Sequence, residues 1–235
     1  MLEQLDGGAE VPEGALVRCL RSPACPRELV ERLAACRWVR SLRRVPPLLL
    51  RHPGCPPAFA WDMLPHLGWH DLLLVVRDPR TMAAIRRQGE RKLLERLKQL
   101  TVGERTALAR HATRSLIAGL LADEAPACVQ ALLDNPRFTE QDAVRLLNAN
   151  GSSRCAAAVV RHPRWGARRA VIEAALRAPV VPLGVALGLM ASLSQARLEE
   201  LARGGDLPAR LLEPLQRLLQ RRRGGDPAPP VPRPE

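Results

Sequence analysis

Cysteine and histidine are the residues of this sequence that could hold a metal ion or an iron–sulfur cluster. Four of the six cysteines fall early in the chain, and they are Cys19, Cys25, Cys36 and Cys55. Five, ten and eighteen residues separate them, which does not resemble the compact runs that bind clusters. His66 and His70 have the i, i+4 spacing of two ligands on one helix, but Gly68 predicts a turn between them and no third ligand is evident. We therefore predict no metal site and no cofactor.

Catalytic motifs are also missing from the sequence. It contains no G-x-S-x-G elbow, no glycine-rich phosphate loop and no H-E-x-x-H motif. Some helical-repeat proteins are DNA glycosylases that use an acid and an aromatic group. Trp69 with Asp71, or Trp165, could imitate that pair, but nothing singles them out. We predict no catalytic residue and a protein that is not an enzyme.

Arginine is the remaining residue type that could recognise a partner. Lys and Arg outnumber Asp and Glu by 36 to 24, which gives a formal net charge of +12. Such a field attracts nucleic acid, anionic membranes or acidic protein, although a genome rich in G and C would raise the Arg and Ala content together. Two stretches contribute to a candidate basic binding face, which consists of Arg37, Arg40, Arg44, Arg161, Arg164, Arg168 and Arg169.

Two interpretations of this basic face stay open. Its first three arginines have the i, i+3, i+7 spacing of one helix face, and one continuous stripe would follow the phosphates of a nucleic acid. Scattered arginines paired with acids, as in Glu28–Arg32, would be solvated faces and would favour a protein partner. Trp38 and Trp165 stand beside these arginines and could stack on bases, but packing between helices is the prediction for both.

The elements that carry these residues are predicted to be helices. Aromatic residues make up only 3% of the chain, and Tyr is absent, whereas β-rich domains depend on aromatic and β-branched residues. Leu, Ala and Arg dominate instead, and all three favour helix. The predicted fold class is all-α.

An internal duplication organises the chain. Residues 50–56 (LRHPGCP) align with residues 176–182 (LRAPVVP) at an offset of 126, with Leu, Arg and both prolines in common. The register continues without a gap, so that Leu72 meets Leu198. Each half then continues into a predicted basic amphipathic helix, over residues 83–98 and 209–222.

Prolines divide each half into units about one helical hairpin long. The residue before each of these prolines is Ser22, His52, Asp78, Asn135, His162 or Ala178. Most of these side chains can accept a hydrogen bond from a free amide at a helix start, and proline suits a turn or a first helical turn. Apolar residues then recur at i, i+4 and i+8, as at Phe59, Met63 and Leu67, which predicts one buried stripe. A single hairpin cannot bury such a stripe, so neighbouring hairpins are predicted to stack as an α-solenoid.

This unit resembles the leucine-rich repeat variant, an α-solenoid repeat of the form R-x-P-x-x-P-x-x-x-L. Residues 51–56 (RHPGCP) followed by Phe59 and Met63 carry the form, and Arg177–Leu189 carries it again. More loosely, residues 15–222 are similar to HEAT and armadillo repeats. The resemblance implies a right-handed α-solenoid with a binding or scaffolding role, and some proteins of this kind hold an iron–sulfur cluster near the N-terminus. Cys25 and Cys55, however, occupy the repeat position of Val181, which predicts an apolar packing site.

Three parts are predicted along the chain. Residues 1–14 form a flexible acidic lead-in, residues 15–222 a single α-solenoid domain with two similar halves, and residues 223–235 a disordered Pro-rich tail. No secretory signal is evident, so a cytoplasmic location is expected. The uncharged stretch 178–196 begins with prolines and ends with polar residues, so we predict no membrane span. The expected function is recognition of a protein or peptide partner, and the alternative is nucleic-acid binding through the Arg-rich face.

Overall fold

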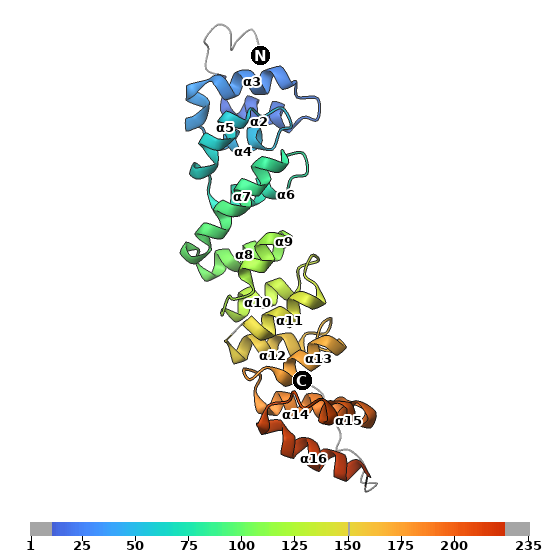
Figure 1. The fold of residues 1–235 in the computed structure, drawn as a ribbon. Coiled ribbons are helices and arrows are strands. Elements are labelled where there is room, and N and C mark those ends of the chain that lie inside the picture. The colour runs from blue at the N-terminus through green and yellow to red at the C-terminus, as the bar shows by residue number, and fades with distance from the viewer. Residues whose placement is uncertain (1–10, 150, 224–235) are drawn as a thin grey trace. The chain divides into compact units, whose positions relative to one another are not determined.

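The computed structural model describes residues 11–149 and 151–223, and over these residues the chain is helical (Figure 1). Fifteen α-helices, α2 to α16, and three short 3-10 helices, η1 to η3, follow one another in these ranges without a strand. The all-α prediction is confirmed. None of the helices in the described part of the chain is long and apolar enough to cross a membrane.

The chain divides into two compact units. Unit 1 comprises Met1–Thr101 with His111–Leu116, and unit 2 comprises Val102–Arg110 with Ile117–Glu235. Helices α8 (Val102–His111) and α9 (Arg114–Leu120) contribute to both. The remaining elements of unit 1 are α2 (Glu13–Arg21), α3 (Arg27–Ala35), η1 (Arg37–Ser41), α4 (Val45–Leu50), α5 (Pro57–Met63), η2 (Leu64–His66), α6 (Trp69–Arg77), α7 (Ala83–Arg96) and η3 (Leu97–Gln99).

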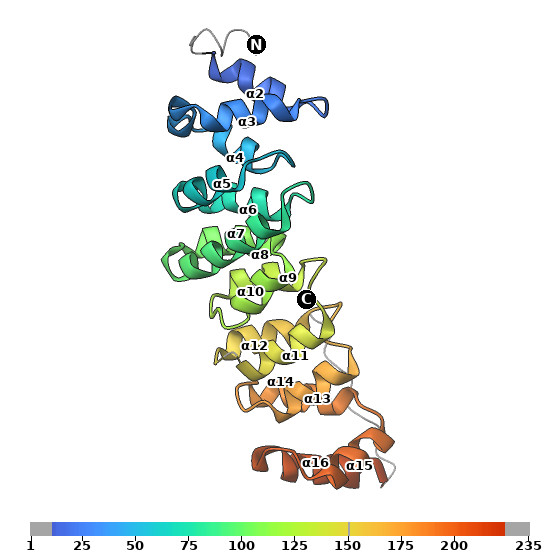
Figure 2. The same ribbon diagram turned by 45° about the horizontal axis from the view of Figure 1, so that its top comes forward.

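Alternate helices pack on one another in unit 1. Helix α2 packs on α4, α4 packs on α6, and α7 packs on both α5 and α6 (Figure 2). Each of these helices carries a fully buried leucine, namely Leu16 of α2, Leu49 of α4 and Leu72 of α6. The helices α2, α4 and α6 therefore form one row of unit 1.

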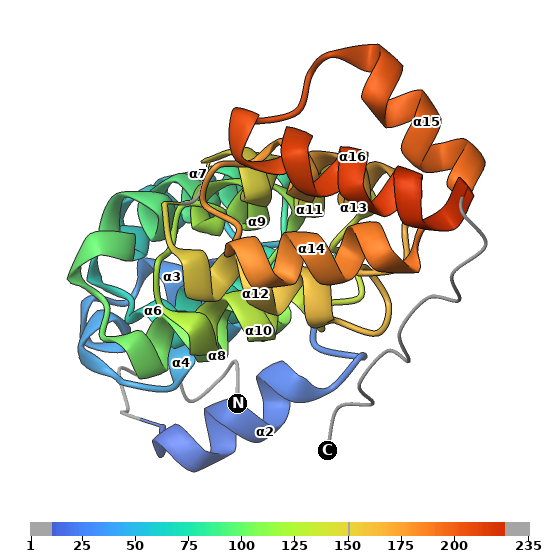
Figure 3. The same ribbon diagram turned by 90° about the horizontal axis from the view of Figure 1, so that it is seen from below.

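Unit 2 contains a comparable arrangement. Its remaining helices are α10 (Pro126–Leu133), α11 (Glu140–Ala149), α12 (Ser153–Arg161), α13 (Arg169–Arg177), α14 (Leu183–Ser192), α15 (Gln195–Gly204) and α16 (Ala209–Arg223). Helix α10 lies beside α12, and α11 lies beside α13 (Figure 3). Helix α16 packs on both α14 and α15.

One turn recurs at all six of the proline positions singled out in the sequence. The backbone carbonyl of the residue before proline accepts a hydrogen bond from the amide three residues later, at 3.0–3.3 Å. Where the residue before proline is polar, its side chain accepts a second bond from the amide two residues later. The five acceptors are Ser22, His52, Asp78, Asn135 and His162, at 2.8–3.3 Å. These side chains are acceptors as predicted, but the predicted place at a helix start is wrong. Each donating amide lies before the next helix begins, and Ser22, Asp78 and His162 are C-caps of the preceding helix.

The fourth residue of each turn points into the core. These residues are Cys25, Cys55, Thr81, Phe138, Trp165 and Val181, and all are buried. The packing role predicted for the cysteines at this position is confirmed, and so is that of Trp165. Its indole N–H donates to the Leu133 carbonyl at 2.9 Å, and its ring meets Phe138 edge-on at 5.4 Å. The turn therefore joins each helix pair and supplies a side chain that packs beneath it.

The offset of 126 residues recurs in helix boundaries and in hydrogen bonds. Helices α5, α6 and α7 begin at residues 57, 69 and 83, and α14, α15 and α16 begin at residues 183, 195 and 209. Arg96 donates to the carbonyls of Pro65 and Leu67. Arg222 donates to those of Ala191 and Leu193, each 126 positions further along. The positions of the two halves can therefore be compared one by one.

Candidate binding site in unit 1

The predicted basic face begins in unit 1, where its three arginines do not share a helix. The 3-10 helix η1 carries Arg37 and Arg40 and ends at Ser41, whereas Arg44 precedes α4. The helix face expected from the i, i+3, i+7 spacing is therefore wrong. The physical reason is Pro46-Pro47, because proline lacks the backbone N–H that a helix interior uses and is favoured in the first turn, so the pair favours a new helix start there.

These three arginines also differ in their surroundings. Arg40 forms an ion pair with Asp62, in which both side chains are about half exposed. Arg37 is exposed on η1 and lies outside the three hollows described below. Arg44 alone reaches a hollow on the row of α2, α4 and α6, where it meets arginines that the sequence did not single out.

This hollow, here called the arginine hollow, has a volume of about 480 Å³. Its arginines are Arg21 from α2, Arg43 and Arg44 before α4, and Arg51 at the end of α4. Its apolar residues are Val17, Pro47, Leu48, Trp69 and Leu74. Leu48, Trp69 and Leu74 are only half buried, so the hollow combines arginines with accessible apolar surface.

Three of the four arginines have side chains that form no ion pair within the described residues, although the Glu13 carboxylate accepts a hydrogen bond from the Arg44 backbone amide at 2.8 Å. Within the described residues, the side chains of Arg21, Arg43 and Arg44 form no ion pair and are exposed. Asp71 is the acidic residue of the lining, and it lies 3.8 Å from His70. The site is therefore locally positive.

The fourth arginine, Arg51, is paired with the buried carboxylate of Asp78. Its carboxylate accepts from Arg51 Nε at 2.9 Å and from Arg80 through its backbone N, Nε and Nη2 at 3.0–3.2 Å. The Asp78 side chain is only 6% exposed. Burial alone would raise the pKa of Asp78, but the hydrogen bonds from Arg80 and Arg51 and the charge of Arg80 outweigh it and lower the pKa to about 2.

Unit 2 contains the duplicated counterpart of the arginine hollow. Arg43 and Arg51 correspond to Arg169 and Arg177 at the offset of 126, and these line a hollow of about 160 Å³ on α13 and α15. Here Glu173 stands in the position of Pro47, and Glu200 stands in that of Leu74. Two of the apolar residues of the unit 1 hollow are thus replaced by acids.

Every arginine of the counterpart is paired. Glu173 pairs with Arg169, Arg177 and Arg197, while Glu200 pairs with Arg169 and Arg197. Asp206 lies 3.7 Å from Arg177. The same scaffold therefore carries a neutralised network in unit 2 and unpaired arginines in unit 1.

The other unit 2 members of the predicted basic face behave differently from one another. Arg161 and Arg168 are exposed and unpaired within the described residues. Arg164 lies over the ring of Trp165, 4.3 Å from its centroid, a cation–π contact. Arg169 belongs to the ion-pair network. Since the seven arginines fall in both units, the basic face as one surface stays a prediction.

The histidine and cysteine residues are not gathered into a ligand set. Gly68 is the N-cap of α6, so His66 in η2 and His70 in α6 stand on different elements, and the predicted turn is confirmed. No group of three His, Cys, Asp or Glu side chains within the described residues could hold a metal ion. All six cysteines are free thiols, and burial raises the pKa of Cys55 and Cys128 to about 12.

Arg21 and Arg51 were missed although the sequence carries a signal for them. Arginine stands two residues before proline at positions 21, 51, 77, 161 and 177. Because the turn ends each helix in the same way, each of these arginines stands at the C-terminal end of its helix. Arg43 has no such signal. Comparison with protein-family models, curated proteins and solved structures gives no match for this chain.

Proposed function

We propose that this chain is a non-enzymatic α-solenoid binding protein that recognises an acidic, partly apolar peptide segment of a protein partner in the arginine hollow. One observation carries the proposal. Arg43 lacks the acids Glu173 and Glu200 that pair with its duplicated counterpart Arg169. The positions of those acids hold Pro47 and Leu74 instead. The side chains of Arg21 and Arg44 likewise form no ion pair within the described residues.

The lining suits a peptide with both acidic and apolar side chains. Guanidinium groups form strong, charge-assisted hydrogen bonds with carboxylates, each contributing about 1.5–3 kcal/mol. An apolar side chain would cover the half-buried surfaces of Leu48, Trp69 and Leu74, and aromatic anchors of this kind often dominate binding energy. Binding would rest on shape and charge, with no bond made or broken.

The helical arrangement supports the solenoid part of the proposal. Alternate helices pack in rows within each unit, and the same turn joins one helix to the next at six places in the described chain. Both features are expected of stacked hairpins related to the leucine-rich repeat variant, HEAT and armadillo repeats. A right-handed superhelix and a single stack are part of this proposal.

Nucleic acid is the competing class of ligand. A polyanion is held by a row of phosphate contacts whose number sets the salt dependence. Of the predicted basic face, Arg40 and Arg169 are already paired with acids, which favours the peptide. The apolar lining of the hollow favours it as well.

The test is fluorescence anisotropy with the full chain. The probes are a labelled peptide of about twelve residues in which Glu alternates with Leu, the same peptide with Lys for Glu, duplex DNA, single-stranded DNA and RNA. We expect the acidic peptide to bind and the basic peptide not to bind. Binding of nucleic acid alone, with log K falling against log salt as for roughly five or more phosphates, would replace the peptide by the alternative.

Two variants locate the site. Leu74→Glu installs the acid that Glu200 supplies in unit 2, and we expect it to weaken the acidic peptide at least about tenfold. The matched control is Arg161→Glu, which reverses an exposed, unpaired arginine outside the hollow and should change affinity less than about twofold. If both variants lost the same affinity for the acidic peptide, binding would depend on net charge only, and the arginine hollow would be rejected as the binding site.

A further inference from the structure

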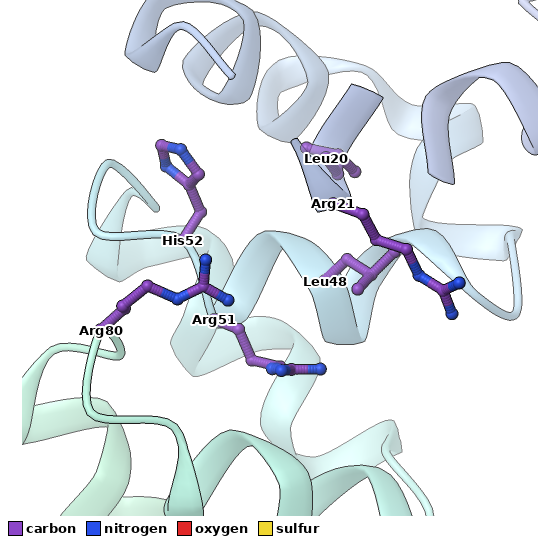
Figure 4. A pocket seen from close by; sticks show the side chains of 6 residues that line it. All are labelled: Leu20, Arg21, Leu48, Arg51, His52 and Arg80. Carbon is purple, nitrogen blue, oxygen red and sulfur yellow. The ribbon is translucent and has the colours of Figure 1, made fainter. Parts of the chain in front are cut away.

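A second hollow adjoins the arginine hollow. It has a volume of about 220 Å³ and is lined by Leu20, Arg21, Leu48, Arg51, His52 and Arg80 (Figure 4). Arg21, Leu48 and Arg51 belong to both hollows. The polar groups come from three successive places: the end of α2, the end of α4 and the turn after α6. A peptide in the arginine hollow could therefore place one side chain here.

Asp78 is a positioning residue for two of these cations. It binds Arg51 through Nε and Arg80 through Nε and Nη2, and so fixes both guanidinium groups beside one carboxylate. Each guanidinium has five N–H donors. Within the described residues, both Nη groups of Arg51 and Nη1 of Arg80 have no acceptor. They remain available to an anion.

The histidine ring adds a donor whose tautomer is set by the turn. The Gly54 amide donates to His52 Nδ1 at 3.0 Å, so Nδ1 is the acceptor nitrogen. In the neutral ring the proton is then on Nε2. His52 therefore offers an N–H whether its ring is neutral or charged.

The duplicated positions show that the fold does not need these groups. At the offset of 126, Arg21 corresponds to Leu147, His52 to Ala178 and Arg80 to Asp206. Only Arg51 keeps its type, as Arg177. The turn at Ala178 still forms, with the Val181 amide 3.3 Å from the Ala178 carbonyl. The cationic groups of the second hollow are thus particular to unit 1.

We propose that the second hollow binds the phosphoryl group of a phosphorylated side chain in the acidic peptide, an inference that rests on the proposed function of the arginine hollow. Arg21, Arg51 and Arg80 carry three positive charges, and Asp78 offsets one of them. The net charge of about +2 that remains matches a phosphoryl group, which carries about −1.5 to −2 charges at neutral pH and three acceptor oxygens. A carboxylate has one charge and two oxygens, and would leave donors unused.

The experiment compares three versions of the acidic peptide, with phosphoserine, serine or glutamate at its centre, by anisotropy with the full chain. We expect phosphoserine to bind at least about tenfold more tightly than serine and more tightly than glutamate. The preference should shrink near pH 5, because the phosphoryl group takes up a proton with a pKa of about 6. Inorganic phosphate should compete with the phosphopeptide and leave the serine peptide bound.

His52→Ala and Arg80→Ala test the hollow itself. We expect both variants to reduce the phosphoserine preference below about threefold while the serine peptide keeps its affinity. Arg37→Ala, an exposed arginine outside both hollows, is the matched control and should leave the preference unchanged. The turn at Ala178 indicates that His52→Ala folds, and circular dichroism checks both variants.

The outcomes separate the two proposals. Binding of the serine and phosphoserine peptides with equal affinity would overturn the phosphoryl site and leave the acidic-peptide proposal standing. Failure of every acidic peptide to bind would overturn both. Tighter binding to phosphoinositide-containing vesicles than to the phosphopeptide would also overturn the inference, because the phosphoryl group would then belong to a lipid.

Discussion

Replacing Asp78 by asparagine should destabilise unit 1 more than replacing any exposed acid. Asp78 is buried beneath Arg51 and Arg80 and accepts hydrogen bonds from both. Its pKa falls from the ordinary value of 3.8 to about 2 in the folded chain. One unit of pKa corresponds to about 1.4 kcal/mol, which gives roughly 2 kcal/mol. Arg80 is 56% exposed, so solvent screening reduces the expected loss to about 1–2 kcal/mol at pH 7.

The pH dependence follows from the direction of this shift. A carboxyl group with a lower pKa in the folded state contributes stability above its unfolded pKa of 3.8. That contribution is lost as pH falls toward the folded pKa of about 2. Near pH 3 it should be about half its value at pH 7. The difference between wild type and Asp78→Asn should therefore shrink on acidification.

Urea unfolding followed by circular dichroism at both pH values measures this difference. Asp62→Asn is the matched control, because the Arg40–Asp62 pair is about half exposed on both sides and should contribute less than about 1 kcal/mol. The reasoning is refuted if Asp78→Asn costs no more than Asp62→Asn at pH 7. A loss that is the same at pH 7 and pH 3 would refute it as well.

Three further predictions concern packing and thiol chemistry. A Cβ at Gly166 would lie 1.9 Å from the Val160 carbonyl oxygen. Gly166→Ala should therefore lower the free energy of unfolding, measured in urea, by about 3 kcal/mol. An unchanged urea midpoint would contradict the close approach. At Gly188, within α14, nothing lies within 4 Å of an added Cβ, so Gly188→Ala should stabilise the chain by about 0.5–1 kcal/mol; a lower melting temperature would count against it. Ellman's reagent near pH 8 should react quickly with the half-buried thiols alone, Cys19 and Cys36, and slowly with the buried ones, Cys25, Cys55, Cys128 and Cys155. Equal rates for all six in the folded protein would show that burial does not protect them.

The features that could be predicted from the sequence are those set by short stretches of chain. The recurring turn follows from proline and from a side-chain acceptor two residues before the donating amide, so Ser22 and Asn135 were correctly assigned to it. The break between η1 and α4 is local too, because Pro46-Pro47 favours a new helix start, but the i, i+3, i+7 spacing of the arginines does not reveal where the preceding helix ends. Proline prevails there because it has no backbone N–H to donate and therefore fits the first turn of a helix better than its interior.

The arginine hollow could not be predicted, because it depends on packing between distant helices. Arg21 and Arg51 are thirty positions apart, and they line one hollow only because α2 packs on α4. The acids that distinguish the two hollows are visible in the aligned halves, since Glu200 replaces Leu74. The replacement indicates a difference in charge between two sites only when the structure shows that both positions line equivalent hollows.

Duplication explains how unpaired arginines can persist on this scaffold. Like charges without counterions repel one another, so the arginine hollow lowers the stability of unit 1 relative to a neutralised site. Unit 2 shows that a few acids, Glu173 and Glu200 among them, are enough to remove the repulsion without altering the helix starts around it. A folded solution with paired charges was therefore available to the same sequence pattern. Departures from local consistency of this kind are expected at functional sites, where a ligand supplies what the fold leaves out. Under the proposed function, the bound peptide would supply the acids that unit 1 lacks, and its binding should stabilise the unit.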